Sequence, residues 1–234
     1  RRSHSSPTLP TTQPDDQTTW CQAPCRPLTS SPVTAPHYIA FEGAEACGKS
    51  TQAALLANRL DAVLTRETGG TAVGARLRAI LHDNAVTNLT ARAEALMTAA
   101  DRAQHIAEVV APALGAGRSV VSDRSLYSTL AYQGFGRELP VEELKQINDW
   151  AIAGRWPQLV VFLDTPDELI AERLRERDLD RFEAAGDAFH QRVLDGFRTM
   201  AGLEPERWIT IDGHGTIEEI EDAIVTALAG RGVQ

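Results

Sequence analysis

The sequence predicts an α/β fold in which a parallel β-sheet has helices on both faces, and three observations lead to this prediction. Short apolar runs alternate with helix-length segments from residue 37 onward. Several runs, such as 159–163, are apolar at every position, which is typical of strands buried on both faces. The first run leads through a glycine-rich turn into a helical segment, the order that builds a phosphate-binding loop.

Five strands and six helices follow from the patterning. The strands are expected at 38–41, 62–65, 119–122, 159–163 and 208–211. The helices carry apolar residues three or four positions apart and are expected at about 50–60, 71–82, 91–110, 141–152, 165–176 and 216–229. Thr165-Pro166 marks one helix start, Thr216 with Glu219 marks another, and the long third helix is expected to end before Pro112.

The first 36 residues differ in composition from the rest. They hold 7 of the 12 prolines and none of the 17 glycines, and Pro, Ser and Thr fill 19 of the 36 positions. Such a segment buries too little apolar surface to offset its ordering entropy. We therefore expect a disordered extension over residues 1–36 and one folded domain over 37–234.

Charge and composition exclude several classes of protein. The net charge is −9, and because the extension carries +1 the folded domain carries −10. An acidic surface argues against binding to nucleic acid or to an anionic membrane. No apolar run approaches the roughly 20 residues of a membrane span, and no apolar segment of a secretory signal follows Arg1-Arg2. Three cysteines cannot form a disulfide framework, and one must remain unpaired. Because a cysteine is tolerated at position 47, we expect a reducing compartment and a cytoplasmic protein.

The turn after the first strand has the phosphate-loop pattern G-x-x-x-x-G-K-S/T. It runs Gly43-Ala44-Glu45-Ala46-Cys47-Gly48-Lys49-Ser50. The glycines let the backbone wrap around an anion, so that consecutive N–H groups and a helix N-terminus face the phosphates. Lys49 is expected to bridge the β- and γ-phosphates and Ser50 to ligate Mg²⁺. Cys47 is either a small filler residue or a reactive thiol at a helix N-terminus.

Polar residues on two other elements are placed to complete a site. Asp123 follows a strand next to the phosphate-loop strand, where it can reach Mg²⁺ or its waters, and Arg124 can hold a second phosphate. The alternative is an internal ion pair. On the long helix, Thr98, Arg102 and His105 share one face, which is either solvated or lines a pocket.

A cluster of arginines lies near the expected helix 165–176. Its members are Arg173, Arg175, Arg177 and Arg181, with acidic residues between them. One interpretation is an exposed, salt-bridged helix. The other is a mobile lid whose arginines close over a phosphoryl group during transfer.

Together these segments resemble the thymidylate kinase family over residues 37–229. The similarity lies in FEGAE through ST at 41–51, TRETGGT at 65–71, AADRAQH at 99–105, DRSLYSTLAYQG at 123–134 and DRFE at 180–183. It implies a P-loop nucleoside monophosphate kinase fold with an arginine-rich lid. The implied activity is transfer of the γ-phosphoryl group of ATP to dTMP with Mg²⁺, by a chain that is typically a homodimer.

The resemblance also implies site residues. ATP would be bound by Gly43, Ala44, Glu45, Ala46, Cys47, Gly48, Lys49, Ser50 and Thr51, and Mg²⁺ by Ser50 and Asp123. The acceptor dTMP would be bound by Glu45, Arg78, Thr98, Arg102, Arg124, Thr129 and Tyr132. The catalytic residues would be Lys49, Arg124, Arg175 and Arg177, because a phosphate loop without arginine resembles the bacterial subtype whose lid supplies it.

Individual roles are implied for five of these residues. Glu45 would contact the sugar 3′-hydroxyl and help to organise the metal. Arg78 and Arg124 would hold the acceptor phosphate. Arg102 would hydrogen-bond the thymine carbonyl edge, and Tyr132 would pack under the sugar.

Two residues depart from the family pattern. Thr68 stands where the family usually has a proline after a cis bond, and because a cis bond before another residue is unfavourable, we expect a differently shaped turn. Thr98 stands where the family usually stacks a phenylalanine on thymine. Ser125 for tyrosine and Ala46 for glycine are milder changes. The alternatives are a kinase for another or modified pyrimidine deoxynucleotide, or a catalytically weak nucleotide-binding module.

Overall fold

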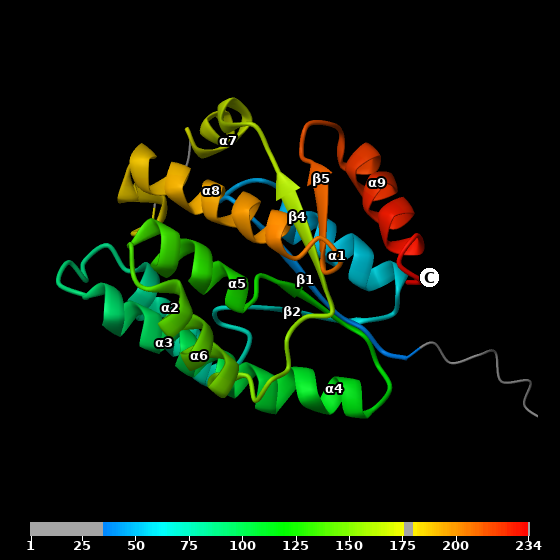
Figure 1. Ribbon diagram of the computed structural model, residues 1–234, viewed down its shortest axis with the longest axis horizontal. Helices are drawn as coiled ribbons and strands as arrows, with labels where there is room; N and C mark the ends of the chain where they lie inside the picture. Colours follow the sequence, from blue (N-terminus) through cyan, green and yellow to red (C-terminus); the bar gives the residue numbers. More distant parts are fainter. Residues whose placement is uncertain (1–34, 176–179, 234) are drawn as a thin grey trace, which may run out of the picture. The chain divides into compact units, whose positions relative to one another are not determined.

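The computed structural model describes residues 35–175 and 180–233, and a five-stranded parallel sheet forms its centre (Figure 1). The strands are β1 (Tyr38–Gly43), β2 (Val63–Arg66), β3 (Val120–Asp123), β4 (Leu159–Asp164) and β5 (Trp208–Asp212). Their order is β2-β3-β1-β4-β5, so the first strand of the chain is central. The predicted fold class and the five predicted strands are confirmed.

Helical segments connect the strands and cover both faces of the sheet. The α-helices are α1 (Lys49–Arg59), α2 (Ala72–His82), α3 (Ala91–His105), α4 (Ala111–Gly115), α5 (Leu126–Thr129), α6 (Val141–Ala151), α7 (Asp167–Leu174), α8 (Asp187–Leu203) and α9 (Ile217–Ala229). Two π-helical segments, η1 (Ile106–Val110) and η2 (Leu130–Gly136), and a 3₁₀ turn, η3 (Glu183–Ala185), extend them. The predicted capping box at the start of α9 is present.

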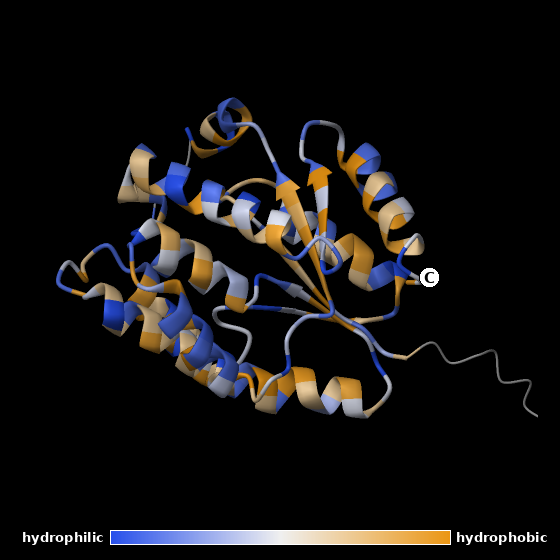
Figure 2. Ribbon diagram, in the orientation of Figure 1, coloured by the Kyte–Doolittle hydropathy of each residue, from blue (hydrophilic) through white to orange (hydrophobic). Residues whose placement is uncertain are grey.

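Two apolar cores lie on opposite faces of the sheet. Because alternate residues of a strand point to opposite faces, Tyr38 and Val160 enter one core and their neighbours Ile39 and Val161 enter the other. The first core is covered by α3, α5, α6 and α8, and the second by α1 and α9. Figure 2 shows apolar residues along β4 and β5 and a mixture of polar and apolar residues along the helices. This burial on both faces explains the continuous apolar runs of the strands.

The strand register gathers polar residues at one edge of the sheet. Asp123 at the end of β3 pairs with Phe41 of β1 on one side and with Arg66 of β2 on the other. The phosphate loop leaves β1 two residues beyond Phe41. Ligands of open α/β sheets bind at the carboxyl ends of the strands, so this edge is where a site is expected.

The sequence patterns missed the helical structure of two segments. Helix α8 was not predicted, although Phe189, Val193, Phe197 and Met200 lie on one of its faces and are buried in the core. The helical stretch formed by α5 and η2 was also missed, because most of its residues are buried and its apolar residues therefore show no single stripe.

The expected end of the long helix before Pro112 is wrong. After α3, the chain continues through the wider π-helical turn η1 into α4, which ends at Gly115. Pro112 lies in the first turn of α4, where its missing N–H is tolerated.

The predicted extension over residues 1–36 lies outside the described residues except for its last two positions, and its disorder stays a prediction. Between residues 35 and 233, with 176–179 left aside, no helix has the length and apolarity needed to cross a membrane.

Candidate active site

The phosphate loop forms an open turn between β1 and α1. Gly43, Ala46 and Gly48 all have positive φ angles, of 147°, 55° and 103°. A side chain at Gly43 would come within 2.8 Å of the carbonyl oxygen of Leu163, so the close approach requires glycine. No side chain caps the N-terminus of α1, which leaves its first N–H groups available to an anion.

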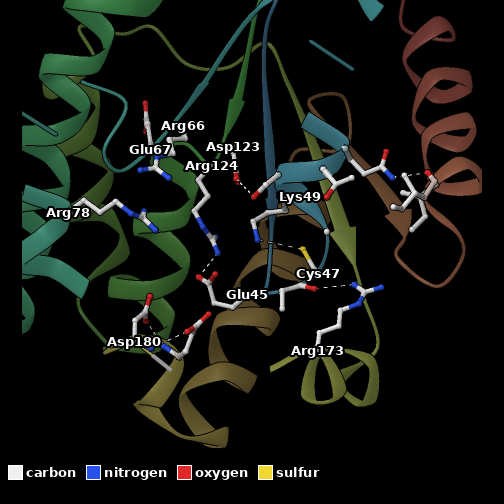
Figure 3. A pocket seen from close by; sticks show the side chains of 18 of the residues that line it. Glu45, Cys47, Lys49, Arg66, Glu67, Arg78, Asp123, Arg124, Arg173 and Asp180 are labelled. Carbon is white, nitrogen blue, oxygen red and sulfur yellow. Dashed lines mark hydrogen bonds and ion pairs between the residues drawn. The ribbon is translucent and has the colours of Figure 1, made fainter. Parts of the chain in front are cut away.

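The residues predicted to bind ATP and Mg²⁺ lie together at the mouth of this loop (Figure 3). The buried Lys49 donates a hydrogen bond from Nζ to the carbonyl oxygen of Ala44 at 2.6 Å. Ser50 Oγ lies 2.5 Å from Asp123 Oδ2, so the predicted pair of metal-binding side chains is in contact. Cys47 is 1% exposed, which favours the filler interpretation over that of an exposed reactive thiol.

Hydroxyl and carboxylate oxygens are the donor types that suit Mg²⁺. The described residues contain no group of three His, Cys, Asp or Glu side chains able to hold a metal ion. Ser50 and Asp123 therefore fit a magnesium ion that takes its remaining ligands from nucleotide phosphates and water, as is usual for this metal.

Arg124 is at the centre of the site. It follows β3 with a positive φ of 74°, and its guanidinium hydrogen-bonds the carbonyl oxygen of Gly43 at 3.1 Å and Ser128 Oγ at 3.0 Å. It also contacts Glu45 Oε1 at 2.5 Å and the hydroxyl of Tyr132 at 3.0 Å. These contacts hold the arginine between the phosphate loop and the side of the site formed by α5 and η2.

Glu45 is kept ionised by this arrangement. Burial by itself would raise the pKa of the Glu45 carboxyl, but the charges of Arg124 and Lys49 outweigh it and lower the pKa to about 2. The Tyr132 hydroxyl adds a hydrogen bond to Glu45 Oε1 at 2.8 Å. A fixed negative charge therefore lies between the lysine of the loop and the arginines opposite it.

Three arginines line the side of the cavity opposite the phosphate loop. Arg78 of α2 and Arg124 were predicted, and Arg66 at the end of β2 joins them. Burial, together with the charge of Arg66, lowers the pKa of Arg78. Because the cations are close enough to repel one another, they favour a bound anion between them (Figure 3). The cavity has a volume of about 560 Å³ and also reaches Lys49.

A smaller cavity of about 70 Å³, which we call the inner chamber, adjoins this one. Both cavities share Glu45, Glu67, Arg78 and Arg124. The inner chamber is also lined by Thr68, Leu81, His82, Thr98, Arg102, Ser128, Tyr132, Gln133 and Phe182. Of the predicted acceptor residues, Thr129 does not line it but contacts two residues that do.

Arg102 is held in the inner chamber by buried partners. Its Nε lies 2.9 Å from Glu67 Oε2, its Nη1 donates to Thr129 Oγ1 at 2.5 Å and its Nη2 donates to the carbonyl oxygen of Ser125 at 2.7 Å. Glu67 is shared with His105, whose Nδ1 lies 2.7 Å from Oε1. The polar face of the long helix is therefore buried and lines a pocket.

The turn after β2 contains the cis peptide bond that Thr68 was expected to avoid. The bond between Glu67 and Thr68 is cis, so the prediction that Thr68 would change the shape of this turn is wrong. The turn brings the Thr68 carbonyl oxygen within 3.2 Å of Arg78 Nη1.

The arginines near α7 are divided between two places. Arg173 donates from Nη1 to the carbonyl oxygen of Ala46 at 3.0 Å and lines the larger cavity. Arg175 is exposed at the end of α7 and does not line it, and Arg177 lies outside the described residues. Arg181 points elsewhere, with Nη2 2.6 Å from Glu94 Oε2. Sequence spacing did not distinguish Arg173 from its neighbours.

A phosphate loop at the centre of a parallel sheet, facing a second group of arginines across one cavity, defines a P-loop nucleoside monophosphate kinase. A sequence model of the thymidylate kinase family matches residues 41–224. The chain is 43% identical to the thymidylate kinase of Synechococcus sp. (strain JA-2-3B'a(2-13)) over 208 residues, which cover 83% of this chain and 98% of that relative. It is 44% identical to that of Desulfovibrio desulfuricans over 196 residues, or 78% and 90% of the two chains.

A solved structure agrees. The crystal structure of thymidylate kinase from Ehrlichia chaffeensis matches with a TM-score of 0.70 and 28% identity, over 83% of this chain and 100% of that one. The chain belongs to the thymidylate kinase family.

Proposed function

We propose that this site transfers the γ-phosphoryl group of ATP to dTMP and so forms dTDP, the reaction of the thymidylate kinase family. The observation that carries the proposal is the meeting of two anion-binding surfaces in one cavity. Lys49 lies on one side, Arg78 and Arg124 lie on the other, and Glu45 lies between them. A donor and an acceptor phosphate bound to these surfaces would face each other.

The donor phosphates are assigned to the phosphate loop. Backbone N–H groups and the N-terminus of α1 hold them, and Lys49 neutralises charge on the β- and γ-phosphates. Mg²⁺, held by Ser50 and Asp123, supplies further charge neutralisation when it is bound. Beyond Thr51 and Gln52 the cavity extends to Ile217, which would offer the adenine ring an apolar contact.

The acceptor phosphate is assigned to Arg78 and Arg124. An ionised phosphate oxygen is itself the nucleophile, so no strong general base is needed and catalysis rests on positioning and on charge neutralisation. Arg124 is preorganised by its contacts to Ser128 and Tyr132. Glu45 is assigned to accept a hydrogen bond from the sugar, and Arg102 to donate one to the base.

The lid arginines are assigned to the developing charge of the transition state. Arg175 and Arg177 remain the predicted catalytic arginines, and Arg173 becomes a third candidate because it already contacts the phosphate loop. Closing this segment over the phosphates would also exclude water, which would otherwise accept the phosphoryl group.

A homodimer is the proposed assembly, and exposed apolar side chains support it. Val73 and Ile80 of α2 are 50% and 45% exposed, and Leu96 of the adjacent α3 is 56% exposed. Apolar groups on neighbouring helices are suited to burial against a second copy. The expected cytoplasmic location stays a prediction.

Initial-rate measurements test the proposed reaction. With ATP and Mg²⁺, dTMP is expected to give equal amounts of ADP and dTDP, with a kcat/KM above those for dUMP and dCMP. The second candidate is a preference for another pyrimidine deoxynucleotide. It is worth testing because Thr98 stands where the family usually stacks a phenylalanine on thymine. Equal or greater turnover of dUMP or dCMP would support that candidate, and no ADP with any acceptor would support the weak-binding module.

A further inference from the structure

The inner chamber has a charged end, which opens to the larger cavity, and a far end. Arg78, Arg124 and Glu45 form the charged end, which it shares with the larger cavity. Thr98, Arg102 and Gln133 line the chamber but not the larger cavity, and so belong to the far end. An acceptor whose phosphate occupies the charged end would place its base among these residues.

A pyrimidine ring needs a partner for its flat face as well as for its edge. Arg102 and Gln133 present polar groups suited to the edge. The side chain that α3 contributes one turn before Arg102 is Thr98, whose hydroxyl is used in hydrogen bonds to the Ala95 carbonyl oxygen and to Thr129 Oγ1. Helix α3 therefore offers no aromatic ring to the chamber.

Three rings line the chamber within the described part of the chain, namely those of Tyr132, His82 and Phe182. The Tyr132 hydroxyl is bound to Glu45 and Arg124, which places that ring at the charged end. His82 Nδ1 lies 2.6 Å from Asp180 Oδ2, so that its ring is committed to a polar contact. Phe182 is the one of these three rings that carries no polar group and makes no hydrogen bond through its side chain.

We propose that Phe182 is the aromatic surface against which the pyrimidine base of the acceptor packs, and that it determines affinity for the base in place of a residue on α3. The inference rests on the proposed function, since it assumes that a deoxynucleoside monophosphate occupies the inner chamber. Stacking on an aromatic side chain accepts any base, so Phe182 supplies affinity while Arg102 reads the edge.

The surroundings of Phe182 hold its ring in place before an acceptor binds. The ring packs edge-to-face against His82 and Tyr132, with centroids 5.2 Å and 5.9 Å away. The Arg181 guanidinium lies 4.7 Å from the ring centroid and does not line the chamber. Arg181 is itself fixed by Glu94 and by a 2.8 Å hydrogen bond from Nε to the Leu81 carbonyl oxygen. A ring that is already ordered loses little entropy on binding.

Binding measurements on Phe182→Leu test the proposal, with Phe189→Leu as the matched control. Phe189 is similarly buried and also packs against Tyr132, at 6.1 Å, but lines neither cavity. Titration calorimetry would give the Kd of dTMP and of 2-deoxyribose 5-phosphate, which has no base. For Phe182→Leu we expect the Kd of dTMP to rise about 5-fold or more, with that of the base-free phosphate within about 2-fold.

Phe182→Tyr, which keeps the ring, should bind dTMP within about 2-fold of the wild type, and Phe189→Leu should change neither constant. If Phe182→Leu does not fold, Phe182→Met keeps most of the volume without a ring and takes its place. The proposal is overturned if the non-aromatic variant binds dTMP as well as Phe189→Leu does, or if both ligands weaken equally. Failure of the proposed function would instead appear as absent dTMP turnover by the unmodified chain.

Discussion

The donor side and the acceptor side of the site are built in different ways. The proposed donor side is one continuous segment, Gly43 to Thr51, which offers mostly backbone N–H groups and the uncapped start of α1. The proposed acceptor side takes its side chains from the turns after β2 and β3, from α2, α3, α5 and η2, and from the segment before η3. The donor side is thus a property of local sequence, and the acceptor side a property of the tertiary fold.

The two sides also differ in how their charges are held before substrate binds. Lys49 contacts the carbonyl oxygen of Ala44 and lines the larger cavity. Arg124 and Arg102 are already paired with Glu45 and Glu67. The acceptor side is therefore preorganised by side-chain networks, and single substitutions there should disturb several residues at once.

The largest expected effect is on the donor side. Lys49→Ala should lower kcat by roughly 10²–10³-fold or more, because it removes the charge next to the transferring phosphoryl group. Initial rates at saturating ATP and dTMP would measure it, with the circular dichroism spectrum unchanged. The chain contains one other lysine, Lys145 on α6, so Lys145→Ala is a matched control that should keep normal turnover. Near-normal turnover by Lys49→Ala would contradict the phosphate-loop assignment.

Arg124→Gln should impair binding and turnover of the acceptor dTMP much more than binding of ATP. It removes the cation from the acceptor phosphate and leaves Glu45 without its closest partner, so kcat/KM for dTMP should fall by roughly 10²-fold or more. The KM for ATP should change much less. Arg118→Gln, at an exposed arginine six residues earlier, should leave both constants unchanged. If kcat/KM fell equally for ATP and for dTMP, the donor side and the acceptor side could not be separated by this substitution.

Thr98→Val should have a smaller effect, confined to the acceptor. It removes the hydroxyl that contacts Thr129, which in turn accepts a hydrogen bond from Arg102. One neutral hydrogen bond contributes about 1 kcal/mol, so KM for dTMP should rise roughly 5-fold with kcat little changed. Thr199→Val removes a comparable hydroxyl on the exposed face of α8 and should have no effect. A fall in kcat alone would argue against a role of Thr98 in positioning Arg102.

An effect on stability, and not on turnover, should appear at acid pH. Because the pKa of Glu45 is lowered from about 4.5 to about 2 in the folded chain, its ionised form stabilises the fold above about pH 4.5. That contribution is lost as the pH falls toward 2. The free energy of unfolding of the wild type should therefore decline more steeply over this range than that of Glu45→Gln. The free energy of unfolding of both proteins would be measured by denaturant titration at each pH. If it declined equally with falling pH in both, the pKa of Glu45 would not be lowered by the fold.

This difference between the two sides explains what the sequence could predict. The phosphate loop is contiguous, so Lys49 and Ser50 could be assigned from spacing alone. The strands were predictable because burial on both faces leaves continuous apolar runs. Helix α8 carries a regular apolar face that could have been found, whereas α5 and η2 are buried nearly all round and carry no such signal.

On the acceptor side, the sequence indicated residues but not their partners. The pairing of Arg102 with Glu67 joins two segments 35 positions apart, and the ion pair of Arg181 with Glu94 joins segments 87 positions apart. Spacing alone placed Arg181 in the same group as Arg173. In the fold, Arg181 contacts Glu94 of α3, whereas Arg173 contacts Ala46 of the phosphate loop. Contacts of this kind depend on topology, which local patterns do not determine.

The central claim is that both substrates bind at once in one cavity, with their phosphates facing each other. A bisubstrate probe, in which adenosine and thymidine are joined through a chain of five phosphates, tests it most directly. The account predicts one probe bound per chain, with an affinity well above that of ATP or dTMP, and competition with each of them. A probe that bound no more tightly than ATP, or that competed with one substrate but not the other, would contradict it.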